Sequence, residues 1–315
     1  MRHLFIVNPA AGKFDRTHEL RDKAESAAAG LRLSWELLTT QAPGHATALA
    51  REAAEQGDPV RIYACGGDGT LNEVVNGAAG HDHVSVTHYP TGSGNDFIKI
   101  FGLDSPLFYD LKELMEGETA PLDLIDCNGR LALNICSVGL DARIGIGMAD
   151  FKRIPFVTGP LAYQLSLVTN VIRGIHRPFR VTVDGERFEG RFTLMCACNG
   201  RFYGGGFNPS PDAIPDDGVL EFLLVHAVSR FTAAQVVGEF AKGKAAELPQ
   251  FITLRRGCEM RVECDRESII NIDGERMDAN LLSFRLSAKK LNFTFPMGTS
   301  WNDELRRRTY EISRY

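Results

Sequence analysis

A glycine-rich turn at residues 66–70 (Gly-Gly-Asp-Gly-Thr) is the segment of this chain best suited to chemistry. It follows the apolar run 61–65 and leads into residues 71–75, where a helix is expected. Glycines let the backbone approach an anionic ligand with its N–H groups, and the helix adds its positive dipole end. The carboxylate of Asp68 suits a phosphate site only if a divalent cation lies between them. We therefore predict a site for a metal-bound nucleotide, the alternative being an ordinary strand-to-helix turn.

Three further polar loops of the first half of the chain also follow predicted strands. Residues 8–13 (Asn-Pro-Ala-Ala-Gly-Lys) combine a glycine with a lysine that could pair with a phosphate, but they lack the Walker A spacing. Residues 39–46 offer threonine hydroxyls, and a helix cap explains them equally well. Residues 90–97 (Pro-Thr-Gly-Ser-Gly-Asn-Asp-Phe) add two glycines and two hydroxyls. Two glycine-rich loops at the ends of nearby strands favour one phosphate pocket over separate turns.

Two acidic loops in the second half are candidates for a metal and for a general base. Residues 211–218 place three carboxylates on a proline-framed loop, and hard divalent cations take such oxygens; a solvated acidic turn is the alternative. Residues 271–275 (Asn-Ile-Asp-Gly-Glu) put an acid before a glycine, which is often only a hairpin turn. In a kinase, a positioned aspartate there could accept a hydroxyl proton. No histidine pair indicates zinc, and no Ser/His/Asp arrangement is legible.

Composition limits the class of protein. The chain has 315 residues, 44% hydrophobic and 24% charged, enough for two domains with their own cores. Its net charge of -5 argues against nucleic-acid binding, which usually needs a basic excess. We expect no signal peptide and no membrane span. Seven cysteines without a C-x-x-C pair favour a reducing cytosol, and Cys196 and Cys198 are predicted core thiols.

The elements that must position these loops alternate between strand and helix in the first 121 residues. Apolar runs at 3–7, 31–37, 60–65 and 84–89 read as strands, and helices are expected at 17–29, 45–56 and from Ser105-Pro106 to about 117. Gly30 is the predicted end of the first helix. The alternation predicts an α/β domain with a mostly parallel sheet in three layers. In such sheets ligands bind beyond the carboxyl ends of the strands.

After Pro121 the pattern changes to hairpins. Asn128-Gly129 and Asp184-Gly185 separate apolar runs and suit type I′ turns. Further strands are predicted at 193–198, 219–225, 259–264, 269–272, 284–287 and 291–295, with helices near 160–175 and 231–242. We expect an antiparallel β-sandwich domain at residues 122–295 and a charged C-terminal helix at 301–315.

Five motifs occur in order along the chain: Asn8-Pro9-x-x-Gly12, GGDGTLNEVVNG at 66–77, Gly92-x-Gly94-Asn95-Asp96-Phe97, Pro211-x-Ala213-x-x-x-Asp217-Gly218 and Ile272-Asp273-Gly274-Glu275. Together they resemble the diacylglycerol kinase catalytic-domain family, specifically the soluble bacterial lipid kinases related to diacylglycerol kinase B. The GGDGT run is shared with NAD kinases. Two departures stand out: Ile98-Lys99 replaces the usual Ala-Arg, and Ser93 replaces a frequent threonine.

The resemblance implies a two-domain kinase with roles for particular residues. The nucleotide would lie on the first domain (1–121), onto which the tail 296–315 would return. Asp273 corresponds to the family's general base, and Asp68 would help to place the catalytic magnesium. A structural magnesium would be held by Asp212, the carbonyl of Pro215, and Asp217. The residues that would line the nucleotide are Asn8, Gly12, Lys13, Thr40, Gly67, Asp68, Gly69, Thr70, Leu71, Asn72, Glu73 and Ser93.

The expected function is transfer of the γ-phosphate of ATP, with Mg²⁺, to a lipid hydroxyl, with diacylglycerol giving phosphatidic acid as the leading case. Two alternatives stay open: a soluble-substrate kinase of the NAD kinase type, and a non-catalytic regulator that binds lipid or nucleotide. The expected partners are a membrane lipid and a nucleotide, with a homodimer as an option. We expect a cytoplasmic protein that contacts the inner membrane face. Leu161, Leu165, Val168 and Ile172 form an apolar helical stripe, which could contact acyl chains or belong to a core helix.

Overall fold

The computed structural model describes residues 1–140 and 176–301, and its chain divides into two compact units. The first unit contains Met1–Leu122 together with the segment that begins at Lys289, and the second contains Asp123–Ala288. The predicted helix at 160–175, its apolar stripe and the tail from residue 302 lie outside the described residues. Within the described part of the chain, no helix is long and apolar enough to cross a membrane.

The first unit is built on a six-stranded sheet that is parallel except at one edge. The strand order is β2-β1-β3-β4-β15-β5, and β5 runs antiparallel to β15. The strands are β1 (Arg2–Val7), β2 (Trp35–Thr39), β3 (Val60–Gly66), β4 (Val84–Pro90), β5 (Glu118–Leu122) and β15 (Leu291–Phe295). Strands β3 and β4 are buried along their whole length, as expected for parallel strands covered on both faces. The predicted α/β architecture is confirmed.

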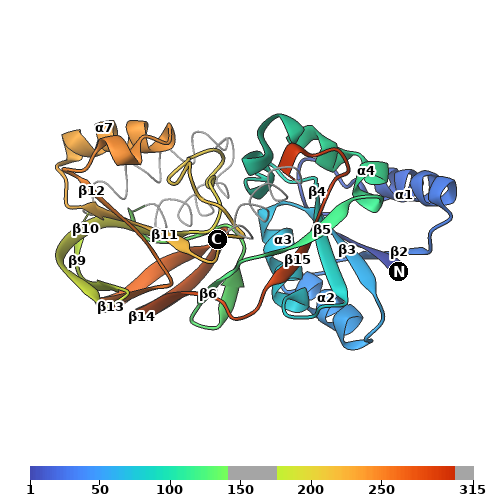
Figure 1. Ribbon diagram of the computed structural model, residues 1–315, viewed down its shortest axis with the longest axis horizontal. Coiled ribbons are helices and arrows are strands. Elements are labelled where there is room, and N and C mark those ends of the chain that lie inside the picture. Colours follow the sequence, from blue (N-terminus) through green and yellow to red (C-terminus); the bar gives the residue numbers. More distant parts are fainter. Residues whose placement is uncertain (141–175, 302–315) are drawn as a thin grey trace, which may run out of the picture. The chain divides into compact units, whose positions relative to one another are not determined.

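Helices cover both faces of this sheet, with α1 and α4 on one side and α2 and α3 on the other (Figure 1). Their bounds are α1 (Thr17–Leu31), α2 (His45–Glu55), α3 (Asp68–Ala78) and α4 (Leu111–Met115), and a 3₁₀ segment η1 (Phe97–Tyr109) precedes α4.

Two predicted helix boundaries are wrong. Gly30 lies inside α1, and Arg32 takes the left-handed conformation after it, with φ 56°. The helix expected to begin at Ser105-Pro106 is α4, capped by Asp110, whose carboxylate accepts from the N–H groups of Lys112 and Glu113. Pro106 lies within η1.

Strand β15 belongs to the first unit, whereas the sequence pattern had assigned residues 291–295 to the second domain. It pairs in parallel with β4 through Phe293 and Val86, and the hydroxyl of Thr87 donates to the carbonyl of Thr294 at 2.8 Å. The rings of Phe293 and Phe295 pack against Phe101 and other aromatic side chains. Because an alternating apolar run fits either sheet, only these long-range contacts decide its place.

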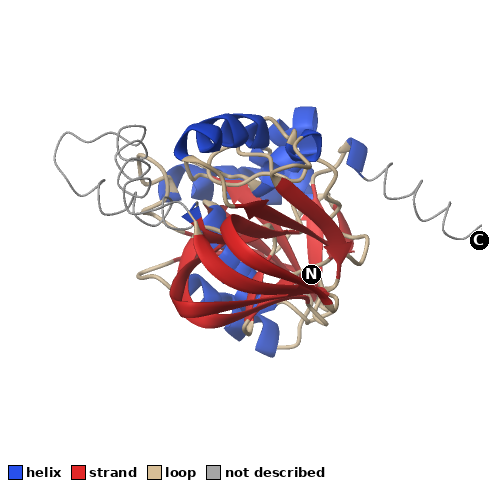
Figure 2. Ribbon diagram, turned by 90° about the vertical axis from the view of Figure 1, so that its left-hand side faces the viewer, coloured by secondary structure: helices blue, strands red, loops and turns tan. Residues whose placement is uncertain are grey.

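The second unit is a nine-stranded antiparallel sheet that curls on itself. Its order is β12-β11-β10-β8-β13-β14-β6-β7, and β9 pairs with both β10 and β13. Figure 2 shows these strands as long, strongly twisted arrows. The strands are β6 (Ile125–Cys127), β7 (Arg130–Ala132), β8 (Ile135–Gly139), β9 (Arg177–Val183), β10 (Glu186–Cys198), β11 (Leu220–His226), β12 (Ile252–Gly257), β13 (Glu259–Ile272) and β14 (Glu275–Leu286), with α7 (Arg230–Ala241) and η2 (Ala245–Glu247) beside them.

Both predicted hairpin turns are present. Asn128-Gly129 and Asp184-Gly185 each have two consecutive positive φ angles, as type I′ turns require. The two strands predicted at 259–264 and 269–272 form one strand, because β13 runs continuously through an irregular register between Glu263 and Ser268.

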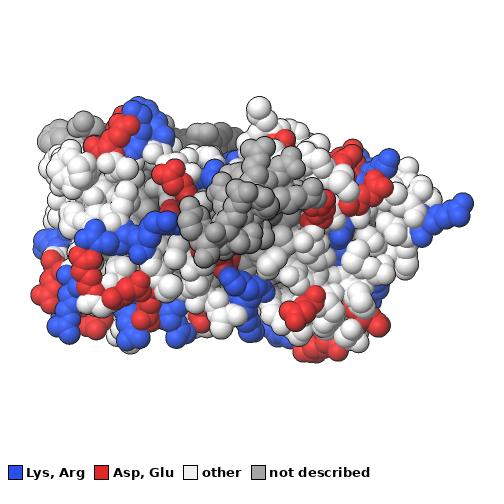
Figure 3. All heavy atoms as spheres, in the orientation of Figure 1, with Lys and Arg blue, Asp and Glu red and all other residues white. Residues whose placement is uncertain are grey.

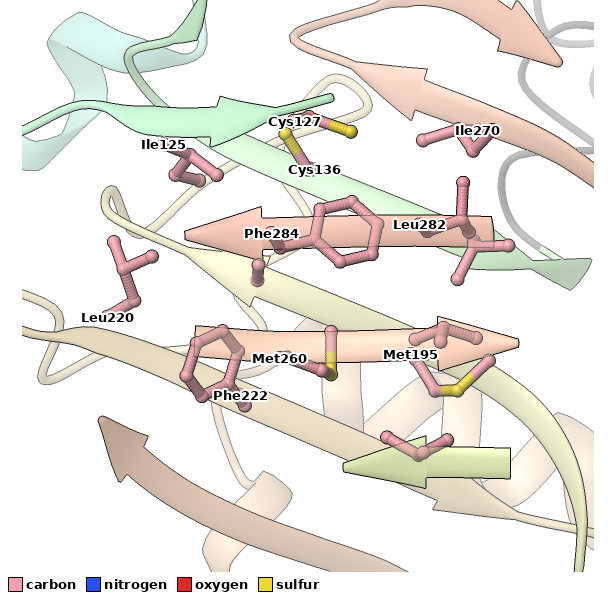
Figure 4. Close-up of a cluster of buried hydrophobic side chains, with 14 of the residues drawn as sticks. Ile125, Cys127, Cys136, Met195, Leu220, Phe222, Met260, Ile270, Leu282 and Phe284 are labelled. Carbon is pink, nitrogen blue, oxygen red and sulfur yellow. The ribbon is translucent and has the colours of Figure 1, made fainter. Parts of the chain in front are cut away.

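Two apolar cores lie on opposite faces of the strands of this unit. The larger core includes Met195 and Phe222 (Figure 4), and the other packs under α7. Alternation along β10 sends Met195 to the first core and Cys196 and Cys198 to the second, which confirms these two as core thiols on one face. On the face drawn in Figure 3, basic and acidic side chains are interspersed. Elsewhere in the contacts of this unit, Arg255 forms an ion pair with Glu186.

Candidate active site

The loops that follow β3 and β4 in the first unit meet at the carbonyl of Gly66. This oxygen accepts hydrogen bonds from the N–H groups of Thr91 (2.8 Å) and Gly92 (3.1 Å) and contacts Nε2 of His88 at 3.1 Å. Because a carbonyl only accepts, Nε2 of His88 carries the hydrogen. The two glycine-rich loops are therefore joined into one structure at the carboxyl ends of adjacent parallel strands.

His88 is wholly buried, and its environment keeps the ring neutral. Burial lowers the pKa of His88 from 6.5 to about 4, because desolvation outweighs the opposing effect of its hydrogen bond to Gly66. Its Nδ1 atom has no hydrogen-bond partner within the described parts of the chain. The side chain thus acts as a neutral donor that fixes the turn after β3.

Glycine is required where these loops touch. A Cβ atom on Gly92 would lie 2.4 Å from the Cα atom of Gly67, and one on Gly12 would lie 2.4 Å from the carbonyl oxygen of Thr91. Gly12 also has a φ angle of 79°, which residues other than glycine rarely adopt. The glycines therefore allow the loops after β1, β3 and β4 to approach one another closely.

The start of α3 offers donors for an anion. The residue before its first residue, Asp68, is Gly67, which has no side chain that could cap the helix. The first N–H groups of a helix have no partner within it, and they lie at the positive end of its dipole. A phosphate fits this position, since backbone donors and the dipole both favour negative charge there.

Two carboxylates flank Gly94 beside this helix start. The N–H group of Asp96 donates to Oδ1 of Asp68 at 2.6 Å, and Asp96 pairs with Lys99. A Cβ atom on Gly94 would lie 2.7 Å from Oδ2 of Asp68 and 3.8 Å from Oδ2 of Asp96. Carboxylate oxygens next to backbone donors that could bind a phosphate suit a divalent cation. Asp96 was absent from the predicted ligands, although its place in the Gly-Asn-Asp run was a usable signal.

Other predicted residues lie around the same loops. The side-chain amide of Asn8 donates to the hydroxyl of Thr70 at 3.0 Å, which ties the first loop to α3. The N–H group of Thr40 donates to the carbonyl of Val7 at the carboxyl end of β1. Lys13 and Ser93 are exposed to solvent. The structure therefore brings the loops after β1, β3 and β4 together, and it places Thr40 directly after the neighbouring β2.

Three residues predicted to bind the nucleotide have structural roles instead. The side chains of Leu71 and Asn72 are buried. The two carboxylate oxygens of Glu73 accept from the N–H groups of Gly44 (2.8 Å) and Ala46 (3.0 Å) at the start of α2. Glu73 thus caps a neighbouring helix, and the proposed nucleotide site does not include these three side chains.

Asp273 in the second unit is held by backbone donors. It lies in the turn between β13 and β14 with φ 49°. Its Oδ2 accepts from the N–H group of Leu133 at 2.7 Å, and its Oδ1 accepts from those of Asn134 (3.1 Å) and Ile135 (2.9 Å). A carboxylate with three fixed donors has a defined orientation, which a general base needs.

The predicted metal loop makes contacts within the protein. The carbonyl of Pro215 accepts from the N–H group of Asp123 at 2.7 Å, and the carboxylate of Asp217 pairs with Arg256. Asp212 is exposed, and within residues 1–140 and 176–301 no group of three His, Cys, Asp or Glu side chains is placed to hold a metal ion. The metal role of this loop stays a prediction; in the present arrangement the carboxylate of Asp217 pairs with Arg256.

Asp123 is a second residue that the predicted ligand set omitted. Its side chain is fully buried, and its Oδ2 accepts from the N–H group of Gly218 at 2.8 Å. It therefore holds both ends of the turn at 215–218. A lone acid within the apolar run Leu122-Asp123-Leu124 was the available signal, since a buried carboxylate needs partners.

Comparisons with known proteins find similarity to kinase family models over both units. The family model of the diacylglycerol kinase catalytic domain matches residues 2–127, and that of the YegS C-terminal NAD kinase beta sandwich-like domain matches residues 134–294. A diacylglycerol kinase of Staphylococcus carnosus is 26% identical over 291 residues, which cover 90% of this chain and 92% of that protein.

Further similarity is found in sequence and in structure. A protein of Pseudomonas aeruginosa described as "Probable lipid kinase YegS-like" is 29% identical over 85% of each chain. The crystal structure of a diacylglycerol kinase from Bacillus anthracis superposes with a TM-score of 0.68 at 21% identity, covering 95% of this chain and 98% of that one. At this identity, the structural match bears on the fold alone.

Proposed function

The chain belongs to the diacylglycerol kinase-like family of bacterial lipid kinases, and we propose that it transfers the γ-phosphate of ATP to a lipid hydroxyl. The proposed acceptor is diacylglycerol, which would give phosphatidic acid for phospholipid synthesis. The observation that carries the proposal is the pair Asp68 and Asp96 beside the start of α3. Carboxylates next to an anion site suit a nucleotide that arrives with a divalent cation.

The residues of the first unit would bind and orient the nucleotide. Backbone N–H groups in the first turn of α3 would face the phosphates, and Lys13 in the loop after β1 would add a charge-assisted contact. Bound Mg²⁺ would neutralise charge that develops on the transferred phosphoryl group, with Asp68 and Asp96 as its proposed protein ligands. Phosphoryl transfer relies mainly on positioning and electrostatic stabilisation, which rigid loops can supply.

Asp273 is the proposed general base. It would accept the proton of the lipid hydroxyl as the hydroxyl oxygen bonds to the γ-phosphorus and the bond from that phosphorus to the β–γ bridging oxygen breaks. Its three backbone donors fix the direction in which the carboxylate points. We infer no catalytic step from a metal at residues 211–218.

The proposed setting is the cytoplasmic face of a membrane. All seven cysteines are free thiols, five of them buried, which suits a reducing compartment. A lipid acceptor requires contact with a bilayer, and we propose that this contact is peripheral. Proteins similar to this chain are named diacylglycerol kinase and lipid kinase, which supports the lipid class.

A phosphoryl-transfer assay with a lipid panel tests the proposal. Purified protein would receive labelled ATP and Mg²⁺ with mixed micelles of diacylglycerol, phosphatidylglycerol, ceramide or sphingosine, and NAD would serve as the soluble acceptor. We expect labelled phosphatidic acid from diacylglycerol. Product from another lipid would change the proposed acceptor, and product from NAD alone would favour the soluble-substrate alternative. ATP binding without any product would favour a regulator.

A further inference from the structure

Asn199 occupies a buried junction in the second unit. It follows directly after β10, and only 1% of its surface is exposed. Its side-chain amide nitrogen donates to the carbonyl of Asp123 at 2.8 Å and to the carbonyl of Leu133 at 2.7 Å. Its backbone N–H group donates to the carbonyl of Asn134 at 2.9 Å. One neutral side chain therefore joins two segments that are distant in sequence.

The first segment carries the donors that hold Asp273. Leu133 accepts from Asn199 through its carbonyl and donates its N–H group to Oδ2 of Asp273. The next residue, Asn134, accepts from Asn199 and also donates to Asp273. The N–H group of Asp273 in turn donates a hydrogen bond to the carbonyl of Ile135 at 3.2 Å. Displacement of residues 133–135 would therefore turn the Asp273 carboxylate.

The second segment carries the loop that contains Asp217. Asp123 accepts from Asn199 through its carbonyl, donates to the carbonyl of Pro215 and accepts from the N–H group of Gly218. Asp123 thus fixes the turn at 215–218 from one side. Asn199 bonds the carbonyls of Asp123 and Leu133 with the two hydrogens of one amide group. Movement of either segment would therefore displace the other through this side chain.

We propose that Asn199 is a positioning residue that couples the orientation of Asp273 to the turn at 215–218. The role depends on two donors from one uncharged planar group. Aspartate cannot supply them when ionised, and an apolar residue would leave two carbonyls without this donor. The inference rests on the proposed kinase function, because its catalytic consequence is the alignment of the general base.

The test compares Asn199→Leu and Asn199→Ser with a matched control, Asn128→Ser. Asn128 also makes two side-chain hydrogen bonds, which join the turn between β6 and β7 to Leu281 and Ser283 of β14. Amide hydrogen exchange would be followed at residues 133–135 and 218, whose N–H groups are the donors to Asp273 and Asp123. We expect faster exchange in both segments of Asn199→Leu, an intermediate effect in Asn199→Ser, and wild-type exchange there in Asn128→Ser.

Steady-state kinetics separates a catalytic effect from a general loss of stability, because a folded but less stable variant would keep its kcat. Well below the unfolding temperature, Asn199→Leu should lower kcat by about 10²-fold, with the KM for ATP unchanged. Faster exchange in only one segment, or equal effects in the control, would overturn the coupling. A wild-type kcat with altered exchange would overturn the catalytic role. If the wild-type protein phosphorylates no lipid, the proposed function fails, and exchange alone still supports or overturns the coupling.

Discussion

The backbone N–H group of Asp96 donates a hydrogen bond of 2.6 Å to the carboxylate of Asp68. Asp68 begins α3 and follows β3, whereas Asp96 follows β4, so this bond joins the two loops at the carboxyl ends of neighbouring strands. Asp68 therefore has two separable properties, a negative charge and a hydrogen-bond acceptor. Substitutions can remove them one at a time.

Asp68→Asn should keep the acceptor for Asp96 and remove the charge. We expect kcat to fall by about 10²-fold or more with little change in Tm, since electrostatic stabilisation is lost while the loop stays in place. Asp68→Ala should lose both and also raise the KM for ATP. Steady-state kinetics and thermal unfolding of both variants check this. Full activity in Asp68→Asn would exclude a role for the charge.

Gly92→Ala should disturb the contact between the two glycine-rich loops. The new Cβ atom would lie 2.4 Å from the Cα atom of Gly67, and overpacking of this kind costs about 1–3 kcal/mol. We expect lower stability and a raised KM for ATP. Gly30→Ala is the matched control, because no atom lies within 4 Å of its Cβ position in α1. That change should stabilise by about 0.5–1 kcal/mol and leave the KM for ATP unchanged.

Asp273→Asn should abolish turnover while ATP binding stays near the wild-type level. The variant is also expected to lose about 1–3 kcal/mol of stability, since an amide NH₂ group would face one of three backbone N–H donors. Calorimetric ATP binding, turnover and chemical denaturation separate the two effects. Asp278→Asn, which alters only an exposed pair with Arg276 on β14, should behave like the wild type. Turnover in Asp273→Asn would show that Asp273 is not the base.

Buried His88 should make the protein less stable in acid. Its pKa is about 4 in the folded protein and near its ordinary value of 6.5 in the unfolded chain. Between these values the unfolded chain binds more protons, so the free energy of unfolding falls as the pH drops from 6.5 to 4, by up to about 3 kcal/mol for this group.

Denaturation at several pH values tests the assignment to His88. His88→Gln removes the titrating group and can still donate to Gly66, so its stability should decline less steeply between pH 6.5 and 4. The same decline remains in part, because burial also lowers the pKa of His3 to about 4. Identical slopes in wild type and His88→Gln would contradict the prediction.

Asp217 and Arg256 allow a test of the predicted structural magnesium. Asp217→Ala should lower Tm with or without Mg²⁺, since the carboxylate pairs with Arg256 and accepts from the N–H group of Val219. If Arg256 occupies the place of a cation, Mg²⁺ should shift the Tm of the wild type little. Arg256→Gln should then gain a Mg²⁺-dependent rise in Tm that the double variant with Asp217→Ala lacks. A large rise in the wild type would instead support a metal at this loop.

Local signals in the sequence were sufficient for much of the fold. The strand and helix periods of residues 3–89 predicted the parallel sheet, because each run must bury its own apolar face. Asn128-Gly129 and Asp184-Gly185 predicted their turns, because few residues accept two positive φ angles. The glycine-rich loops were found for the same reason: their spacing follows from backbone geometry within a few residues.

Tertiary contacts decided what no local pattern could. Residues 291–295 alternate as any strand does, and only pairing with β4 and β5 assigns them to the first unit. Glu73 resembles a loop ligand in sequence, yet it caps α2 because the two helices pack together. Asp96, Asp123 and Asn199 gain their places from partners 28 to 95 residues away. The sequence therefore determined which chemical groups are present, and long-range hydrogen bonds determined where each of them points.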